Sequence, residues 1–382
     1  MKENLRVLCV VRPAVGGIKA HVVTLAQGLR DAGCEVVFAC PADSEVANAV
    51  RDSHFPVCPV HITDAVRPIT DLVCIAQIAR LVRRGHFDVV HAHGFKAGIV
   101  GRLGAMLGGC PVRVLTVHNH VLYREETSAG AKMLHRSVER MLAPFTSRVI
   151  TVSNSLRAEL VDAYHLPSHK VVTIHNGVPS ERFLKPQNPG IARALLGLPS
   201  TVPIIGSMCR FTPQKGLTYL VAALPSIRES FPDLHVVLGG DGPLRATLQE
   251  QVRAVGADDI VTFPGMVADV AAVFPALDLY VAPSLSEGLP LTLVEAAYAG
   301  LAAVSTTGGG TSEVITDGKT GVLVPPADSH ALATAIIGLL ADPTRLERMK
   351  RSARKDALAR FAPQKMVNAT LDVYRMARCR AH

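Results

Sequence analysis

The sequence contains no tryptophan, and aromatic residues make up only 4% of its 382 residues. No module that stacks nucleic-acid bases on aromatic side chains is visible, so nucleic acid is not predicted as a partner. A helix that crosses a bilayer needs a run of about 18 apolar residues, and no such run occurs. The nearest approach, residues 97–117, is interrupted by Arg102 and Arg113.

The eight cysteines include no C-x-x-C pair, which disfavours a dithiol redox site. Several lie within apolar, strand-like runs, as expected for small buried side chains in a reducing compartment. The first residues lead directly into a strand rather than into a cleavable signal peptide. We therefore expect a cytoplasmic protein, with the inner face of the membrane as a further place of action.

Two phosphate-binding signatures are absent as well. The sequence has neither the G-x-G-x-x-G dinucleotide fingerprint nor the G-x-x-x-x-G-K-[ST] phosphate loop. Their absence argues against a dehydrogenase and against a P-loop ATPase.

Short apolar runs alternate with helical patterns along the whole chain. This alternation predicts α/β domains, each with a doubly wound parallel sheet. A segment rich in Pro, Gly and Asn after residue 185 is expected to link two such domains. We predict domains at 1–185 and 201–355, a ligand cleft at the carboxyl ends of both sheets, and a final segment, 356–382, that returns to the first domain.

The net charge of +8 is unevenly distributed. The first half and the last thirty or so residues are basic, whereas most of the second half is acidic. An anionic membrane face or an anionic small substrate would explain this pattern, and ordinary solvated surface charge is the alternative.

Two groups of residues are suited to binding phosphate. Gly16 and Gly17 come between the first strand and its helix, where exposed N–H groups and the helix dipole favour an anion, although glycine pairs in turns are common. Arg210 and Lys215 follow the first strand of the second half. Two cations at one strand end can converge on a diphosphate.

The segment from Ser284 to Ala296 offers two carboxylates beside a helix start. Pro290 is suited to a first helical turn, so the N–H groups of Leu291 and Thr292 can hold a phosphate. Glu287 and Glu295 can accept hydrogen bonds from the vicinal hydroxyls of a sugar or a ribose.

Taken together, these motifs resemble glycosyltransferase family 4, which comprises retaining enzymes of the GT-B fold. The resemblance covers essentially the whole chain. The residues that carry it are Gly16-Gly17, Arg210 with Lys215-Gly216, Gly240-Asp-Gly-Pro-Leu244 and Glu287-x7-Glu295.

The resemblance implies a role for each matching residue on the donor side. Gly16 and Gly17 would lie near the donor phosphates, and Arg210 and Lys215 would neutralise the leaving diphosphate. Glu287, in the segment Glu287-Gly288-Leu289, would bind the transferred sugar. The backbone of Leu291 and Thr292 would bind phosphate. Glu295 would bind the ribose, and the backbone of Val267 would contact the base.

The resemblance also implies a catalytic centre of His118 and Glu287. Attack would occur from the front face, with the leaving phosphate helping to deprotonate the acceptor, and with neither a metal nor another cofactor. His120 lies close to His118 in the sequence, so either histidine is a candidate. The segment 308–313 lacks the proline usual in the family and receives no role.

The pairs His91-x-His93 and His118-x-His120 each place two rings on one face of an extended chain. A metal needs three or four ligands, and no Asp or Cys stands at ligand spacing from either pair. The sequence therefore predicts polar substrate contacts for these histidines rather than a metal site.

The expected function is that of a retaining hexosyltransferase in polysaccharide or glycoconjugate biosynthesis. The donor would be a UDP- or GDP-sugar, and the acceptor a glycan, a lipid-linked sugar or a small molecule. Two alternatives are a nucleotide-sugar epimerase or hydrolase of the same fold, and a non-catalytic donor-binding partner in a biosynthetic complex.

Overall fold

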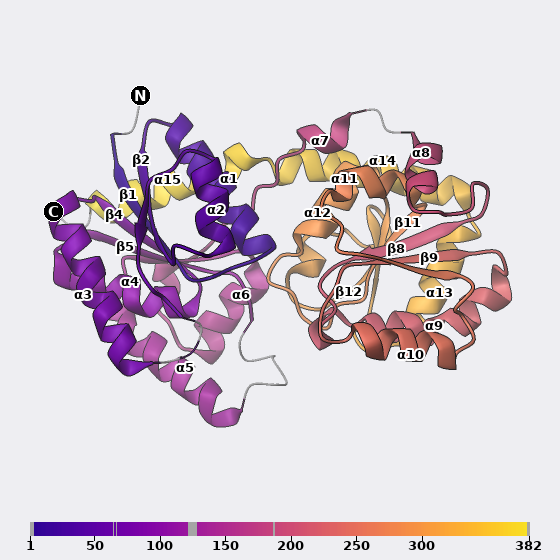
Figure 1. The fold of residues 1–382 in the computed structure, drawn as a ribbon, viewed down its shortest axis with the longest axis horizontal. Coiled ribbons are helices and arrows are strands. Elements are labelled where there is room, and N and C mark those ends of the chain that lie inside the picture. The colour runs from indigo at the N-terminus through magenta and orange to yellow at the C-terminus, as the bar shows by residue number, and fades with distance from the viewer. Residues whose placement is uncertain (1–3, 64, 66, 121–127, 186–187, 380–382) are drawn as a thin grey trace. The chain divides into compact units, whose positions relative to one another are not determined.

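The computed structural model describes residues 4–63, 65, 67–120, 128–185 and 188–379. The chain divides into two compact units (Figure 1). Unit 1 comprises Met1–Val178 together with Pro363–His382, and unit 2 comprises Pro179–Ala362. The sequence predicted the end of the first domain at residue 185, seven residues after the observed boundary at Val178. It predicted the return to the first domain at residue 356, seven residues before the observed boundary at Pro363.

Unit 1 is built on a seven-stranded parallel sheet of order β3-β2-β1-β4-β5-β6-β7. The strands are β1 (Arg6–Val11), β2 (Glu35–Cys40), β3 (Val57–Pro59), β4 (Val89–His93), β5 (Val112–Val117), β6 (Arg148–Thr151) and β7 (Val171–Thr173). Its helices are α1 (Gly17–Asp31), α2 (Glu45–Asp52), α3 (Pro68–Gly85), α4 (Phe95–Gly108), α5 (Ala129–Leu142), α6 (Asn154–Ala158) and α15 (Pro363–Cys379).

Strand β1 shows why this sheet is covered on both faces. Val7, Cys9 and Val11 belong to one hydrophobic core, and Leu8 and Val10 belong to the other. Side chains alternate across a strand, so a continuous apolar run requires helices on both sides of the sheet.

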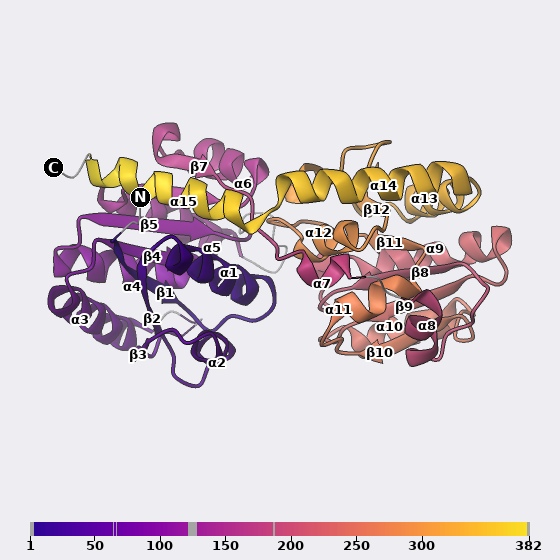
Figure 2. The ribbon, with the colours of Figure 1, turned by 90° about the horizontal axis from the view of Figure 1, so that it is seen from above.

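Helix α15 comes last in the sequence but packs against α1 near the start of the chain (Figure 2). Val367 on α15 lies so close to Gly28 on α1 that a Cβ at Gly28 would be 2.3 Å from Val367 Cγ2. The buried Tyr374 hydroxyl is 2.7 Å from His91 Nδ1 at the centre of the sheet. The helix therefore completes one core of unit 1.

Unit 2 repeats the plan with a six-stranded parallel sheet of order β10-β9-β8-β11-β12-β13. Its strands are β8 (Ile204–Met208), β9 (His235–Gly239), β10 (Val261–Gly265), β11 (Leu279–Ala282), β12 (Ala303–Thr306) and β13 (Gly321–Val324). Its helices are α7 (Glu181–Leu184), α8 (Pro189–Leu195), α9 (Leu217–Ser230), α10 (Arg245–Ala254), α11 (Val270–Val273), α12 (Leu291–Tyr298), α13 (Ser329–Leu340) and α14 (Pro343–Arg360).

Two parallel, doubly wound sheets confirm the predicted fold class. Four of these elements were not predicted: β3, α2, α7 and α8. Helix α8 lies within the segment interpreted as a linker, where the Asn188 side chain caps it by accepting hydrogen bonds from Gly190 N and Ile191 N. None of the helices in the described ranges combines the length and the apolar run that a bilayer crossing requires.

In each sheet the strand order reverses direction at one point. In unit 1 this point lies between β1 and β4, and in unit 2 it lies between β8 and β11. Loops at the carboxyl ends of such strand pairs diverge and leave room for a ligand. The residues that the sequence singled out cluster at these two points.

Candidate functional site

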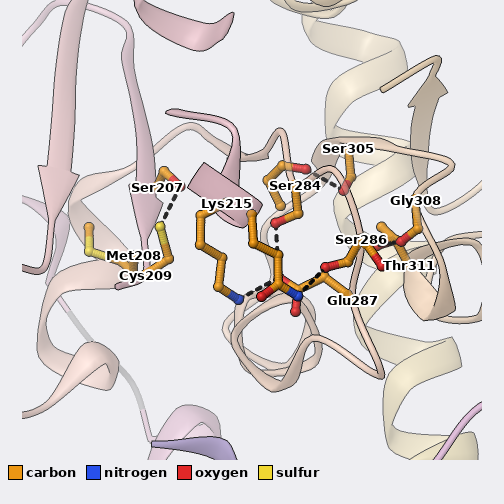
Figure 3. Close-up of polar contacts among 12 residues, drawn as sticks. Ser207, Met208, Cys209, Lys215, Ser284, Ser286, Glu287, Ser305, Gly308 and Thr311 are labelled. Atoms are coloured by element: carbon orange, nitrogen blue, oxygen red, sulfur yellow. Dashed lines mark hydrogen bonds and ion pairs between the residues drawn. The ribbon is translucent and has the colours of Figure 1, made fainter. Parts of the chain in front are cut away.

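The centre of the site in unit 2 is an ion pair between Lys215 and Glu287 (Figure 3). Lys215 ends a short 3-10 turn after β8, and Glu287 lies in the loop that follows β11. The two strands are neighbours in the sheet, so these loops meet. Ser284 Oγ donates a hydrogen bond of 2.9 Å to Glu287 Oε1, which fixes the carboxylate from a second side.

Both partners of this pair are largely withdrawn from solvent. The Glu287 residue is only 7% exposed. Burial of Lys215 by itself would lower its pKa, but the Glu287 carboxylate and the Cys209 thiol outweigh that effect and raise the pKa above its usual value. Lys215 is therefore a fixed positive charge at neutral pH, held next to a hydrogen-bond acceptor.

Two glycines allow the loops around this pair to approach closely. Gly216 has φ +63°, and a Cβ there would be 2.1 Å from the Pro283 carbonyl oxygen. A Cβ at Gly308 would be 2.5 Å from the Leu285 carbonyl oxygen. The Gly308 loop also supports Glu287 directly, because Gly310 N donates a hydrogen bond of 2.8 Å to the Glu287 carbonyl.

Helix α12 begins immediately after the Glu287 loop. Pro290 stands at its N-cap and offers no side-chain cap. The first N–H groups of a helix have no partner within the helix, so those of Leu291 and Thr292 are available to an anion. Gly288 and Leu289, both buried, connect Glu287 to this helix start.

Glu295 lies farther along α12 and pairs with Arg182 of α7 at 2.8 Å. Burial raises the pKa of Glu295, and Arg182 opposes the rise. Arg182 is also 3.5 Å from Asp269, two residues beyond Val267. Val267 contacts the end of β9, since a Cβ at Gly239 would be 3.1 Å from Val267 Cγ2. Glu295, Arg182 and Asp269 thus form a second polar group in unit 2, and Val267 lies two residues before Asp269.

Arg210 is exposed, directly after β8 and Cys209. Arg210 therefore lies at the same sheet edge as Lys215, as its place in the sequence predicts. Its side chain is more accessible to solvent than that of Lys215, which suits a cation that binds a ligand at its outer end.

In unit 1, the two glycines lie at the start of α1. Gly16 is the N-cap residue of the helix, with φ +60° and ψ −128°, and Gly17 is its first helical residue. Both are exposed. Gly16 has no side chain that could cap the helix. The first N–H groups of α1 therefore receive no hydrogen-bond acceptor from the N-cap residue.

His118 follows β5 and is 6% exposed. Its Nε2 is 3.4 Å from His93 Nδ1, and its ring centroid is 4.7 Å from that of His21 on α1. Burial, together with the neighbouring rings and Arg12, holds the pKa of His118 well below its usual range. His118 is therefore a neutral imidazole at physiological pH.

His120, the other candidate of the pair, has different surroundings. Its Nδ1 is in hydrogen-bond contact with the buried Glu159 carboxylate, and its Nε2 is 3.4 Å from Ser155 Oγ. Both ring nitrogens of His120 thus have partners from the α6 region. A ring that is hydrogen-bonded at both nitrogens is suited to supporting the loop, whereas His118 makes fewer hydrogen bonds.

The structure brings Lys215, Glu287, Gly288 and the α12 start together at one sheet edge, as the sequence predicts. Sequence reasoning did not foresee Ser284 as a partner of Glu287, Arg182 as a partner of Glu295, or His21 beside His118. It also gave the Gly308 loop no role. Only the Gly308-Gly-Gly310 triplet carried a visible signal, since glycines mark close approaches of the backbone.

Two family models match the chain, one over each half. The model for "Glycosyltransferase Family 4" matches residues 15–182, and the model for "Glycosyl transferases group 1" matches residues 191–356. The two matched ranges contain the site residues of unit 1 and of unit 2, respectively.

Several known proteins are similar to this chain over most of its length. The D-inositol 3-phosphate glycosyltransferase of Stackebrandtia nassauensis is 30% identical, over 94% of this chain and 86% of the relative. The Escherichia coli UDP-Gal:alpha-D-GlcNAc-diphosphoundecaprenol alpha-1,3-galactosyltransferase is 27% identical, over 80% of both chains. The crystal structure of Anabaena HepE in complex with UDP has a TM-score of 0.84 at 22% identity, covering 97% of this chain and all of HepE.

Proposed function

Because the chain belongs to the group 1 glycosyltransferases, we propose that it transfers a hexose from a nucleoside-diphosphate sugar to an acceptor with retention of configuration. Unit 2 would bind the donor, and unit 1 would bind the acceptor.

The observation that carries this proposal is the Lys215–Glu287 pair beside the α12 start. Lys215 offers a positive charge to the diphosphate, whose negative charge grows as the glycosidic bond breaks. Glu287 offers acceptor oxygens to the sugar hydroxyls, and the N–H groups of Leu291 and Thr292 bind phosphate. Arg210, from the same sheet edge, would neutralise the diphosphate further.

Glu295 and Val267 would define the nucleoside end of the donor site. The Glu295 carboxylate would accept hydrogen bonds from the ribose hydroxyls and exchange part of its contact with Arg182. The backbone at Val267 would contact the base. Binding therefore replaces one set of polar contacts by another and leaves no charge unpaired.

In unit 1, a neutral His118 would accept or donate a hydrogen bond to a sugar hydroxyl. The departing phosphate, rather than this weakly basic ring, would take the acceptor proton. Gly16 and Gly17 would leave room for the phosphates. The chain's own residues would thus position the substrates and stabilise the leaving phosphate. No cofactor enters the proposed reaction.

The names of the similar proteins narrow the proposed substrates. HepE was solved with UDP, and the E. coli relative uses UDP-galactose with a diphosphoundecaprenol-linked acceptor. We favour a UDP-sugar donor and a lipid-linked or phosphorylated sugar acceptor for this chain on that basis.

The donor site can be tested by calorimetric binding of UDP-, GDP-, ADP- and dTDP-sugars. Lys215→Met and Glu287→Ala should weaken binding of the preferred donor by at least about tenfold, since each removes a charge-assisted contact worth roughly 1.5–3 kcal/mol. Lys350→Met is the matched control, because Lys350 forms a similar pair with Glu347 on α14. If none of the four donors binds, or if both site variants bind like the wild type, the donor site is wrong.

Turnover separates transfer from the alternatives. A transferase consumes the donor only when an acceptor is added, and the product keeps the anomeric configuration of the donor. Consumption of the donor in the absence of any acceptor would instead identify a hydrolase or an epimerase. NMR spectroscopy of the anomeric protons reads both outcomes.

We also propose that helix α5 contacts an anionic membrane surface. Its exposed face carries Met133, Leu134 and Met141, which are 67%, 59% and 66% exposed, beside the exposed Arg136 and Arg140. The acidic residue of the helix, Glu139, is buried against Arg102. An apolar face flanked by basic residues and without exposed acids is typical of a helix lying in the membrane interface.

The basic C-terminal residues are the other candidates for membrane contact that the sequence offers, and they stay a prediction: Arg351, Arg354, Lys355, Arg375, Arg378 and Arg380. Arg375 and Arg378 pair with Asp372 and Asp88, and Arg380 lies outside the described residues. Arg351, Arg354 and Lys355 belong to unit 2.

Flotation with vesicles of phosphatidylglycerol and phosphatidylcholine tests the membrane proposal. Replacing Met133, Leu134 and Met141 by serine should abolish flotation with the anionic vesicles. The control replaces Ile69, Leu72 and Val73, a comparably exposed group on α3 that includes Asp71 in its turn. Equal flotation of both triple variants, or no preference for anionic lipid, would contradict the proposal.

A further inference from the structure

Three buried histidines of unit 1 meet where the strand order of the sheet reverses. His21 lies on α1 after β1, His93 ends β4, and His118 follows β5. One ring nitrogen from each lies within 4.8 Å of the other two. The register explains the meeting, since His93 pairs with Val11 at the end of β1 and with Thr116 near the end of β5.

Three of the six ring nitrogens of this cluster lack a hydrogen-bond partner among the described residues. Among the residues that the structure describes, neither nitrogen of His21 has a partner, nor does Nε2 of His93. His21 is 4% exposed and His93 is fully buried, so water is excluded from most of their surface. Buried polar atoms normally find partners because leaving them unpaired costs about 1–3 kcal/mol each.

The neighbouring His91 shows what a structural histidine in this sheet looks like. Its Nδ1 is 2.7 Å from the Tyr374 hydroxyl, and its Nε2 is 2.7 Å from Thr116 Oγ1. Both nitrogens of His91 are thus used by the fold. His21 and His93 are also buried, but the fold uses neither nitrogen of His21, and the Nδ1 of His93 faces only the ring nitrogen of His118.

The cluster is also in the protonation state that a metal requires. Burial lowers the pKa of His21 to about 4 and holds the pKa values of His93 and His118 well below the usual range. At neutral pH each ring is uncharged and keeps one nitrogen lone pair. Neutral imidazole is the form of histidine that binds zinc.

We propose that His21, His93 and His118 form a binding site for Zn²⁺. Three imidazoles plus a water molecule are a common ligand set for zinc, with Zn–N distances of about 2.0–2.1 Å. Tetrahedral ligands at that distance lie roughly 3.4 Å apart. His93 Nδ1 and His118 Nε2 are already separated by 3.4 Å, and a nitrogen of His21 lies within 4.8 Å of a nitrogen of each neighbour, so metal binding requires the His21 ring to move closer.

Asn176 supports the fourth position of this site. It is 4% exposed and lies beside His21, whose pKa its side chain raises, and its Oδ1 forms no hydrogen bond of ordinary geometry with the described residues. This oxygen is suited to accepting a hydrogen bond from a metal-bound water, as outer ligands of zinc sites do. The positive charge of the Arg12 guanidinium acts on His118. This charge disfavours binding of a free cation, but it favours a negatively charged hydroxide as the fourth ligand of the metal.

Zinc in this site would inhibit the proposed transfer, because it takes the nitrogen lone pair of His118 that a sugar hydroxyl would use. This consequence rests on the proposed function, whereas the binding of zinc does not.

Competition with a chromophoric chelator measures zinc binding to the full-length protein at neutral pH, without donor or acceptor. We expect one Zn²⁺ per chain, and binding at least about 100-fold weaker in His21→Phe and in His93→Phe. Phenylalanine fills the space of the ring without offering a ligand. His169→Phe and His330→Phe remove exposed histidines and should bind zinc like the wild type.

Cobalt substitution gives an independent readout. Co²⁺ bound by three histidines and water should show the visible absorption of a four-coordinate complex, and this absorption should vanish in His21→Phe. Absence of a stoichiometric site in the wild type would overturn the proposal, and so would unchanged affinity in both cluster variants. If zinc binds as expected but transfer is equally fast with and without it, the inhibitory role is wrong. If zinc binds as expected but the zinc-free protein consumes no donor in the presence of acceptors, the proposed function alone is wrong.

Discussion

Arg102 shows what a single charged residue does in an apolar part of the sequence. Its side chain is 1% exposed on α4, and it forms two hydrogen bonds of 2.9 and 2.7 Å with the Glu139 carboxylate. The Gly98 carbonyl and the Thr146 hydroxyl accept its remaining bonds. This arginine, which excluded a membrane span at the level of sequence, therefore joins α4 to α5 inside unit 1.

Removing the partner of Arg102 should destabilise unit 1 strongly. We expect Glu139→Gln to lower the free energy of unfolding by about 3–5 kcal/mol, because a buried guanidinium is left without a counter-ion. Urea unfolding measures the loss. The exposed pair of Lys19 and Glu45 provides the comparison, since Glu45→Gln should cost at most about 1 kcal/mol. Similar losses in the two variants would contradict this account of the buried pair.

At the scale of elements, the loops after β8 and β11 determine the donor site. Neither loop is long, and the loop after β8 approaches the loop after β11 at a glycine. Gly216 adopts a left-handed conformation directly after Lys215, and the Pro283 carbonyl occupies the space where a Cβ would lie. The position of Lys215 opposite Glu287 thus depends on the glycine that follows it.

Gly216→Ala should therefore weaken donor binding while unit 2 stays folded. A Cβ at φ +63° costs about 1 kcal/mol, and the clash with Pro283 displaces Lys215 from Glu287. We expect a loss of donor affinity of at least about tenfold by calorimetry, since small displacements of positioning groups have large effects. Gly338→Ala on α13 meets no atom within 4 Å and should bind donor normally. Normal binding by Gly216→Ala would show that the loop tolerates the side chain.

At the scale of the whole molecule, unit 1 concentrates titratable groups in its interior and unit 2 does not do so to the same degree. Burial lowers the pKa of His21 to about 4 and that of His91 to about 3, with His93 and His118 also well below the usual range. In the unfolded chain these rings titrate near 6.5. The unfolded state therefore binds more protons below that pH.

This difference predicts that unit 1 is acid-labile. The stability that the neutral rings provide is complete above about pH 6.5 and is lost as the pH falls toward 4, at up to about 1.4 kcal/mol per pH unit for each ring. Hydrogen exchange of the β1 and β4 peptides at about pH 7 and about pH 5 measures this loss of stability. His21→Phe should reduce the loss by one ring's share, whereas the exposed His330→Phe should not alter it. An unchanged pH dependence in His21→Phe would contradict the burial of a neutral ring.

The sequence alone determined the fold class and the family. The alternation of apolar strand runs with helical patterns is a local property of the sequence, and so are the motifs at strand ends that carry the resemblance. Both the predicted fold class and the predicted family were confirmed. The Lys215–Glu287 neighbourhood was also within reach, because both residues follow strands and parallel strands present their carboxyl ends at one edge. Their roles stay predictions until donor binding is measured.

Only the tertiary structure decided which distant side chains meet. Arg182 reaches Glu295, Tyr374 reaches His91, and His21 joins His93 and His118, although nothing in the spacing of these residues indicates it. Such contacts depend on strand order and on the register of neighbouring strands, which are properties of the whole sheet. A pair of histidines in the sequence was for that reason interpreted as a polar contact, and a cluster of three became visible only when the sheet placed α1 beside β4 and β5.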